Sequence, residues 1–177
     1  MSASSFFLCG NSICGVKKIQ LNHIKAPCIK NCVDYVGGRV CVIAGTGSNC
    51  TKSAVKLSKT AESLGVDGLL VVTPYYNKAT QAGLVQMFTR LAEESTAPVI
   101  LYNVPTRTGV NIEPATYAAL AEHPMIQGIK EANGQIDKIT ETMALCGDKL
   151  TLYSGNDDQI VPLMSVGGKG VISVLSN

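Results

Sequence analysis

Four reactive side chains follow short apolar runs of the sequence, at positions where strands would end: Tyr76, Tyr102, Lys130 and Asp157. A lysine at the inner end of an apolar strand is partly removed from water, which lowers its pKa and leaves a neutral amine. A neutral amine attacks carbonyl groups to form imines, the intermediates of aldol-type chemistry. An ion pair between Lys130 and Glu131, or another acid, is the alternative interpretation of the same pattern.

Two residues around the strand that ends at Tyr102 have types that suit such a reaction. The phenol of Tyr102 can transfer protons if a hydrogen-bonded relay connects it to solvent, because its ordinary pKa is about 10. Arg107 lies on a predicted loop after the same strand, and a guanidinium can bind a carboxylate through two parallel hydrogen bonds. A buried tyrosine in the wall of the fold and a solvated arginine are the alternative interpretations.

The elements that must position these residues alternate along the chain from Arg39 onward. Apolar, β-branched runs centre near residues 42, 71, 100, 129, 152 and 172, a spacing that fits a strand, a helix and two loops. Between them, amphipathic patterns predict helices over 51–64, 80–94, 113–122, 135–145 and 157–166. This alternation indicates an α/β fold with a parallel sheet, either doubly wound or a (β/α)8 barrel. In a barrel the carboxyl ends of the strands converge on one face, so the four reactive residues would share a site.

Composition narrows the classes of function. The 177 residues are 46% hydrophobic and 16% charged, as expected for one globular domain. A net charge of +2 argues against a nucleic-acid partner, and no apolar run approaches the ~18 residues of a membrane-spanning helix. Seven cysteines, an odd number without regular spacing, indicate a reducing compartment, so we expect a cytoplasmic protein.

Residues 1–38 form an atypical N-terminal segment. Residues 1–33 contain four lysines, four cysteines and no acidic residue, unlike the remainder of the chain. A targeting peptide is one alternative, although the segment lacks arginine and a clear amphipathic period. A zinc site is another, with His23, Cys28, Cys32 and Cys41 as ligands. Their spacing matches no compact zinc pattern, so we expect neither a metal nor another cofactor.

Six stretches between residues 42 and 174 carry the most specific signal in the chain. Among them are Val72-Thr73-Pro74-Tyr75-Tyr76-Asn77-Lys78, Leu101-Tyr102-Asn103-Val104-Pro105-Thr106-Arg107-Thr108-Gly109 and Gly128-Ile129-Lys130-Glu131-Ala132. Together with 42–49, 153–157 and 167–174, they resemble the dihydrodipicolinate synthase family of pyruvate-dependent class I aldolases and lyases. The resemblance covers residues 39–177 nearly without gaps and implies strands 3 to 8 of a (β/α)8 TIM barrel, incomplete at both ends.

The resemblance implies roles for three of the reactive residues. Lys130 would form a Schiff base with pyruvate, and Tyr102 would donate and accept protons over that imine. Arg107 would hold the carboxylate of the second substrate, aspartate semialdehyde. The product would be 4-hydroxy-tetrahydrodipicolinate, at the entry to the diaminopimelate and lysine pathway.

Further positions gain roles by the same resemblance. Tyr76 would complete a proton relay in a neighbouring subunit, so a homo-oligomer, a dimer or a tetramer, is expected. Gly155 and Ile172 would line the pyruvate pocket with backbone groups. Asn49 and Tyr75 match positions that contact inhibitory lysine in feedback-regulated members of the family.

One departure from the family pattern leaves the activity of this chain open. The Gly-Thr-Thr-Gly-Glu loop, whose threonines complete the relay and hold the pyruvate carboxylate, has no counterpart in the sequence. Ser12 is a candidate substitute hydroxyl. A non-catalytic truncated paralogue or regulatory subunit is therefore the first alternative to an impaired synthase. A pyruvate-dependent aldolase of the N-acetylneuraminate lyase type is the second.

Overall fold

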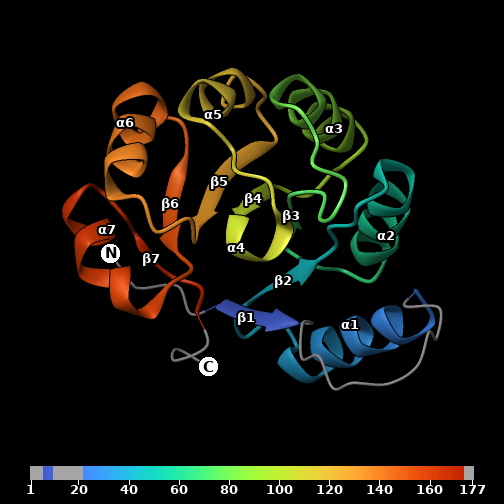
Figure 1. The fold of residues 1–177 in the computed structure, drawn as a ribbon. Helices are drawn as coiled ribbons and strands as arrows, with labels where there is room; N and C mark the ends of the chain where they lie inside the picture. Colours follow the sequence, from blue (N-terminus) through green and yellow to red (C-terminus); the bar gives the residue numbers. More distant parts are fainter. Residues whose placement is uncertain (1–5, 10–21, 174–177) are drawn as a thin grey trace.

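Seven parallel strands form one curled sheet in the computed structural model, which describes residues 6–9 and 22–173 and the side chains of residues 25–173 (Figure 1). The strands lie side by side in chain order: β1 (Phe6–Cys9), β2 (Cys41–Gly45), β3 (Gly68–Val72), β4 (Val99–Asn103), β5 (Ile126–Glu131), β6 (Thr151–Ser154) and β7 (Gly170–Val171). A doubly wound sheet would reverse its strand order, so that alternative is excluded. The predicted partial (β/α)8 barrel is confirmed.

The helices are α1 (Asn22–Val36), α2 (Thr51–Ser63), α3 (Gln81–Glu93), α4 (Pro105–Thr108), α5 (Pro114–Leu120), α6 (Ile136–Cys146), the 3-10 helix η1 (Asp157–Gln159) and α7 (Ile160–Ser165). The longer ones cover the outer face of the sheet, whereas the short α4 lies inside the ring that they form (Figure 1). The five helices predicted from amphipathic patterns are present, the last one divided into η1 and α7. In the described part of the chain, no helix has the length and apolarity needed to span a membrane.

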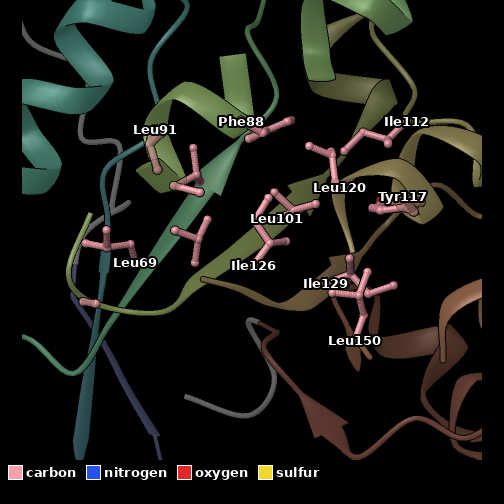
Figure 2. Packing of buried hydrophobic residues seen from close by; sticks show 14 of the residues in the cluster. Leu69, Phe88, Leu91, Leu101, Ile112, Tyr117, Leu120, Ile126, Ile129 and Leu150 are labelled. Atoms are coloured by element: carbon pink, nitrogen blue, oxygen red, sulfur yellow. The ribbon is translucent and has the colours of Figure 1, made fainter. Parts of the chain in front are cut away.

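Strand residues alternate between two different environments. Residues of one face pack against the helices in the main core, where Leu69, Leu101 and Ile129 are completely buried in the same cluster as Phe88 of α3 and Leu120 of α5 (Figure 2). Residues of the other face point into the concave interior, where Ile43, Leu70 and Ile100 form a smaller cluster with Tyr102 and Tyr153. Reactive side chains on the concave face are therefore separated from the helices by one layer of sheet.

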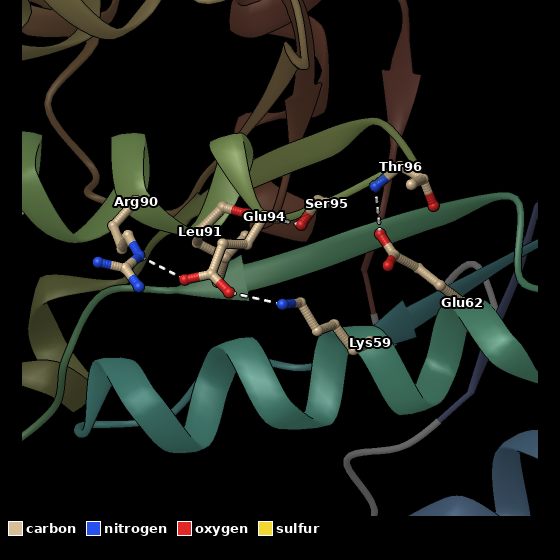
Figure 3. A network of polar contacts seen from close by, with 7 residues as sticks. All are labelled: Lys59, Glu62, Arg90, Leu91, Glu94, Ser95 and Thr96. Atoms are coloured by element: carbon tan, nitrogen blue, oxygen red, sulfur yellow. Dashed lines mark hydrogen bonds and ion pairs between the residues drawn. The ribbon is translucent and has the colours of Figure 1, made fainter.

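Polar contacts on the outer surface align neighbouring helices and strands (Figure 3). Glu94, which follows α3, accepts hydrogen bonds from Lys59 of α2 and from Arg90. The carboxylate of Glu62 accepts a hydrogen bond of 2.7 Å from the backbone amide of Thr96, in the turn before β4. Exposed ion pairs of this kind each contribute at most about 1 kcal/mol. They join α2 to the end of α3 and to the turn before β4.

Candidate active site

Strand register brings Tyr102 and Lys130 together. Tyr102 of β4 lies opposite Lys130 of β5, and Lys130 lies opposite Tyr153 of β6. The Lys130 Nζ atom is 4.0 Å from the centroid of the Tyr102 ring. Two residues predicted to share a site from their positions at strand ends are therefore in direct contact on the concave face.

The Lys130 amine has an unusually low affinity for a proton. Burial lowers its pKa to about 8, and the positive charge of Arg107 contributes in the same direction. Among the described residues, Lys130 makes no ion pair with an acid. The alternative of a pair with Glu131 is wrong, because the Glu131 carboxylate is hydrogen-bonded to Asn103 and Tyr117. About a tenth of the Lys130 amine is therefore neutral at pH 7, far more than for an ordinary lysine.

The Tyr102 hydroxyl keeps its proton in this environment. Burial raises the pKa of Tyr102, while the charge of Arg107 opposes the shift. Across residues 25–173, the hydroxyl of Tyr102 has no hydrogen-bond partner that would relay its proton. Ser12, the candidate substitute for the family threonine, lies outside the described residues.

Arg107 is held above the two reactive groups by a single helical turn, α4, where the sequence predicted a loop. Pro105 occupies the first turn, and Gly109 ends it in the left-handed conformation with φ of 73°, which glycine adopts without strain. The turn is tied to the end of β3, because the Thr73 hydroxyl donates a hydrogen bond of 3.0 Å to that of Thr108. Arg107 itself is exposed, and its positive charge acts on both Lys130 and Tyr102.

Gly155 borders the Lys130 side chain. A Cβ atom at Gly155 would lie 2.9 Å from Lys130 Cε, closer than side-chain atoms normally approach. The Gly155 amide donates a hydrogen bond of 2.7 Å to the Glu131 carbonyl, which fixes this approach. Ile172, just after β7, is buried, and its amide donates to the Ser154 carbonyl at 2.8 Å. The role of both residues in a pyruvate pocket stays a prediction.

Tyr76 is not brought to Lys130 within this chain. Its side chain is 90% exposed, and its backbone has a φ of 74°, a left-handed conformation that is rare for a bulky residue. Its amide donates a hydrogen bond of 3.1 Å to the Thr108 carbonyl. Asp157, the fourth residue of the predicted cluster, is exposed at the start of η1.

The loops that carry Asn49 and Tyr75 lie next to each other. The Asn77 side-chain amide donates a hydrogen bond of 2.6 Å to the Asn49 carbonyl. Tyr75 is 41% exposed on the same loop as Asn77. The two residues predicted to bind lysine thus belong to neighbouring surface loops after β2 and β3.

Three residues behind the site were not anticipated. Asn103, Tyr117 and Glu131 are almost completely buried between the sheet and α5. Asn103 Nδ2 donates a hydrogen bond of 3.0 Å to Glu131 Oε1, and the Tyr117 hydroxyl donates to the same oxygen. Burial raises the pKa of Glu131 to about 7, although these bonds oppose the shift. The sequence signal that could have indicated this cluster is the presence of two polar residues, Asn103 and Glu131, at strand positions that face the helices.

The described side chains do not form the zinc site considered from the sequence. Within residues 25–173, no three His, Cys, Asp or Glu side chains gather around one point. Of the proposed zinc ligands, Cys28 and Cys41 are exposed free thiols, and the His23 side chain lies outside the described part. A Cβ atom at Gly47 would lie 2.5 Å from the Val72 amide nitrogen. Close packing against β3 therefore explains why residue 47, in the turn after β2, is a glycine.

Comparisons with known proteins agree with this geometry. The sequence model of the Dihydrodipicolinate synthetase family matches residues 15–177. The 4-hydroxy-tetrahydrodipicolinate synthase of Clostridium novyi is 49% identical over 173 residues, which make up 98% of this chain and 58% of that protein. The chain thus spans a little over half the length of this relative.

Two solved structures superpose on most of the chain. A chloride-inhibited dihydrodipicolinate synthase from Acinetobacter baumannii, complexed with pyruvate, has a TM-score of 0.85 and 42% identity, covering 88% of this chain and 53% of its own. The enzyme from Cyanidioschyzon merolae with lysine bound has a TM-score of 0.83 and 38% identity, over the same shares of the two chains. Because the family model matches most of the sequence and these structures share the curled parallel sheet, the chain belongs to the dihydrodipicolinate synthetase family.

Proposed function

We propose that the chain carries the imine-forming part of a 4-hydroxy-tetrahydrodipicolinate synthase, a lyase that condenses pyruvate with aspartate semialdehyde. The main support is the Lys130 amine, whose pKa is lowered to about 8 and which lies against the ring of Tyr102, whose hydroxyl keeps its proton. A desolvated amine next to a proton donor is the arrangement that imine formation needs.

The first step joins Lys130 to pyruvate. The lone pair of Lys130 Nζ attacks the keto carbon, the carbonyl oxygen takes up protons and leaves as water, and a carbon–nitrogen double bond remains. Loss of a methyl proton then gives an enamine, because the imine accepts the electron pair. Tyr102 would exchange protons with these atoms through its hydroxyl, and its ring packs against the amine, with the ring centroid 4.0 Å from Nζ.

The second step uses Arg107 and Tyr102. The enamine carbon attacks the aldehyde carbon of aspartate semialdehyde, and the aldehyde oxygen takes up a proton as the new bond forms. Arg107 on α4 would hold the carboxylate of this substrate. Ring closure by the amino group of the substrate releases the Lys130 amine with the product.

Contacts beyond a single chain are part of the proposal. The exposed Tyr76 side chain would enter the site of a neighbouring subunit in a homo-oligomer. Asn49 and Tyr75 would contribute to a lysine-inhibitor site, consistent with the lysine-bound relative from Cyanidioschyzon merolae. Arg107 and the Tyr75-Tyr76-Asn77 loop favour a small aldehyde acid over the sugar acids of the N-acetylneuraminate lyase type. The domain division at residue 38 and a cytoplasmic location also stay predictions.

Reductive trapping tests the proposal. The 177-residue chain is incubated with pyruvate and cyanoborohydride, and peptide mass mapping locates the reduced adduct. We expect one dominant adduct at Lys130, and none there in Lys130→Arg, because a guanidinium stays protonated and cannot attack a carbonyl.

The same experiment separates the alternatives. Labelling spread over surface lysines, or none in a folded sample, would contradict imine formation and favour the non-catalytic paralogue. When an aldehyde is added before the reductant, loss of the trapped adduct with a sugar aldehyde but not with aspartate semialdehyde would favour the N-acetylneuraminate lyase type.

A further inference from the structure

Behind the candidate active site, a hydrogen-bonded cluster links two strands and a helix. Asn103 of β4, Glu131 of β5 and Tyr117 of α5 are 0%, 1% and 1% exposed. The Glu131 carboxylate accepts hydrogen bonds from both the Asn103 side-chain amide and the Tyr117 hydroxyl. Tyr117 belongs to the main apolar core, together with Leu101, Leu120 and Ile129. A carboxyl group is an unusual element of such an interface, because removing it from water is costly.

The cluster lies on the opposite face of the sheet from Tyr102 and Lys130, at the adjacent positions of the same two strands. In the sheet, Tyr102 lies opposite Lys130 and Asn103 lies opposite Glu131. Because side chains alternate across a strand, the first pair faces the concave interior and the second faces the helices. The 3.0 Å bond between Asn103 and Glu131 therefore joins the same two strand ends that carry Tyr102 and Lys130.

Main-chain bonds extend the cluster to the surroundings of Lys130. The Ala132 amide donates to the Asn103 carbonyl at 2.9 Å, which continues the pairing of β4 and β5 past the reactive residues. The Glu131 carbonyl accepts from the amide of Gly155, the residue that borders the Lys130 side chain. A displacement of Glu131 would thus shift both walls between which the lysine lies.

Stability alone does not account for this arrangement. A buried carboxyl contributes little net stability compared with a well-packed apolar residue of similar size. A buried polar network in which every group is hydrogen-bonded instead fixes one geometry, because any buried group that loses its hydrogen bond raises the free energy of the folded state. Precise geometry matters at this place, since small displacements of reacting groups strongly reduce the rate of a reaction.

We propose that Asn103, Tyr117 and Glu131 are positioning residues, which hold the ends of β4 and β5 so that Lys130 lies desolvated against Tyr102. The consequence for catalysis rests on the function proposed above. The positioning itself is a property of the folded chain and is measured without any substrate.

Two variants test the cluster, each with a different change. Tyr117→Phe removes one hydroxyl and keeps the carboxyl group, whereas Glu131→Gln keeps the length of the side chain and removes its charge. Thr142→Val is the matched control, because it deletes an equally buried hydroxyl whose bond, to the Lys138 carbonyl at 2.9 Å, lies within α6. Circular dichroism and thermal melting establish that each variant is folded.

Two readouts are compared in the folded variants. The full chain is acetylated competitively, without pyruvate, at a series of pH values, and peptide mapping follows the modification of Lys130. The midpoint is the pH at which the acetylation rate of Lys130 reaches half of its maximum. Trapping with saturating pyruvate and cyanoborohydride gives the rate of imine formation. If the cluster is loosened, water reaches the Lys130 amine and favours its charged form. We therefore expect the acetylation midpoint in Tyr117→Phe and Glu131→Gln to rise by about half a pH unit or more. We expect trapping at a fixed pH below 8 to slow about tenfold or more.

The outcomes separate the two proposals. Unchanged midpoints in folded Tyr117→Phe and Glu131→Gln, or an equal shift in Thr142→Val, would overturn the positioning role. A midpoint that falls in Glu131→Gln and stays unchanged in Tyr117→Phe would also overturn it, since charge alone would then be acting. If the unmodified chain forms no pyruvate adduct, the proposed function fails, and the acetylation midpoints still decide the positioning role. If Glu131→Gln does not fold, Tyr117→Phe decides alone.

Discussion

Lys130 and Glu131 are neighbours in the chain, yet they lie on opposite faces of the sheet. Burial lowers the pKa of the Lys130 amine to about 8 and raises the pKa of the Glu131 carboxyl to about 7. Both shifts favour the neutral form, because a charge is poorly solvated in either place. In the proposed reaction the neutral form of Lys130 is the nucleophile, so its burial on the concave face would favour imine formation.

The pH dependence of trapping follows from the lowered pKa of Lys130. The rate of adduct formation depends on the neutral fraction of the amine, which increases as pH rises through the pKa. We therefore expect trapping at Lys130 to reach half of its maximum near pH 8. The reaction of Nα-acetyl-lysine under the same conditions is the control, with an ordinary pKa of about 10.4. A Lys130 midpoint close to that of the control would contradict the desolvated environment.

Arg107 has a role limited to the second substrate in this proposal. Arg107→Ala should leave pyruvate trapping at Lys130 within about twofold, apart from a small upward shift of the pKa when the neighbouring cation is lost. The concentration of aspartate semialdehyde needed for half-maximal condensation should rise about ten- to a hundredfold, since a charge-assisted hydrogen bond contributes ~1.5–3 kcal/mol.

The measurement is the residual condensation rate as a function of aspartate semialdehyde concentration. Arg90→Ala is the control variant, because Arg90 is an exposed arginine whose partner, Glu94, lies on the outer surface. Equal losses of trapping and condensation in Arg107→Ala would indicate that Arg107 stabilises α4 rather than the substrate.

At the scale of elements, periodicity in the sequence predicted most of what positions the site. Strands β2 to β6 and five helical segments follow apolar patterns strong enough to be recognised locally. The α4 turn has four residues, too few for a periodic signal, and it depends on Pro105 and Gly109 at its two ends. Helix α1 contains Pro27, which usually interrupts helices, and it was not predicted.

The pairing of side chains across elements was predictable only in part. The contact of Lys130 with Tyr102 follows from the rule that parallel strand ends converge. The partners of Glu131 do not, because Tyr117 and Asn103 are 14 and 28 residues away in the chain. From the sequence, the adjacent Lys130 was the obvious partner, and alternation along β5 directs the two side chains apart.

Gly155, just after β6, leaves no space for a side chain beside Lys130. A methyl group at this position would meet Lys130 Cε at 2.9 Å and the Ala132 Cβ atom at 3.1 Å. The lysine stem must then move, so Gly155→Ala should slow pyruvate trapping about tenfold or more. Gly170→Ala in β7 is the control, because its new methyl group would lie at 3.5 Å from the Tyr153 ring, an ordinary contact. Trapping in Gly155→Ala at the rate of the control would exclude this role for Gly155.

In the whole molecule, the described residues bring together Lys130 and Tyr102, the pair proposed to form the imine, and they offer the Tyr102 hydroxyl no relay for its proton. Tyr102, Lys130 and Arg107 come from consecutive strands and the turn between them, and contacts among β3, β4, β5 and β6 hold them. The Gly-Thr-Thr-Gly-Glu sequence that would supply the relay hydroxyl is absent from the 177 residues. In the proposed reaction, imine formation therefore needs only residues that the described chain brings together, whereas condensation also needs a relay hydroxyl.

We predict that the 177-residue chain forms the pyruvate imine and condenses it slowly. Loss of a positioned acid–base group reduces a rate by about 10²–10⁴-fold, and the condensation step depends on proton transfer through Tyr102. The measurement compares product formation by the purified, folded chain with that of the Clostridium novyi relative at equal site concentration, alongside trapping at Lys130 in both. Rapid trapping with slow product formation is the expected result. Product formation within about tenfold of the relative would mean that another hydroxyl, such as that of Ser12 or a group from a second subunit, has replaced the threonine.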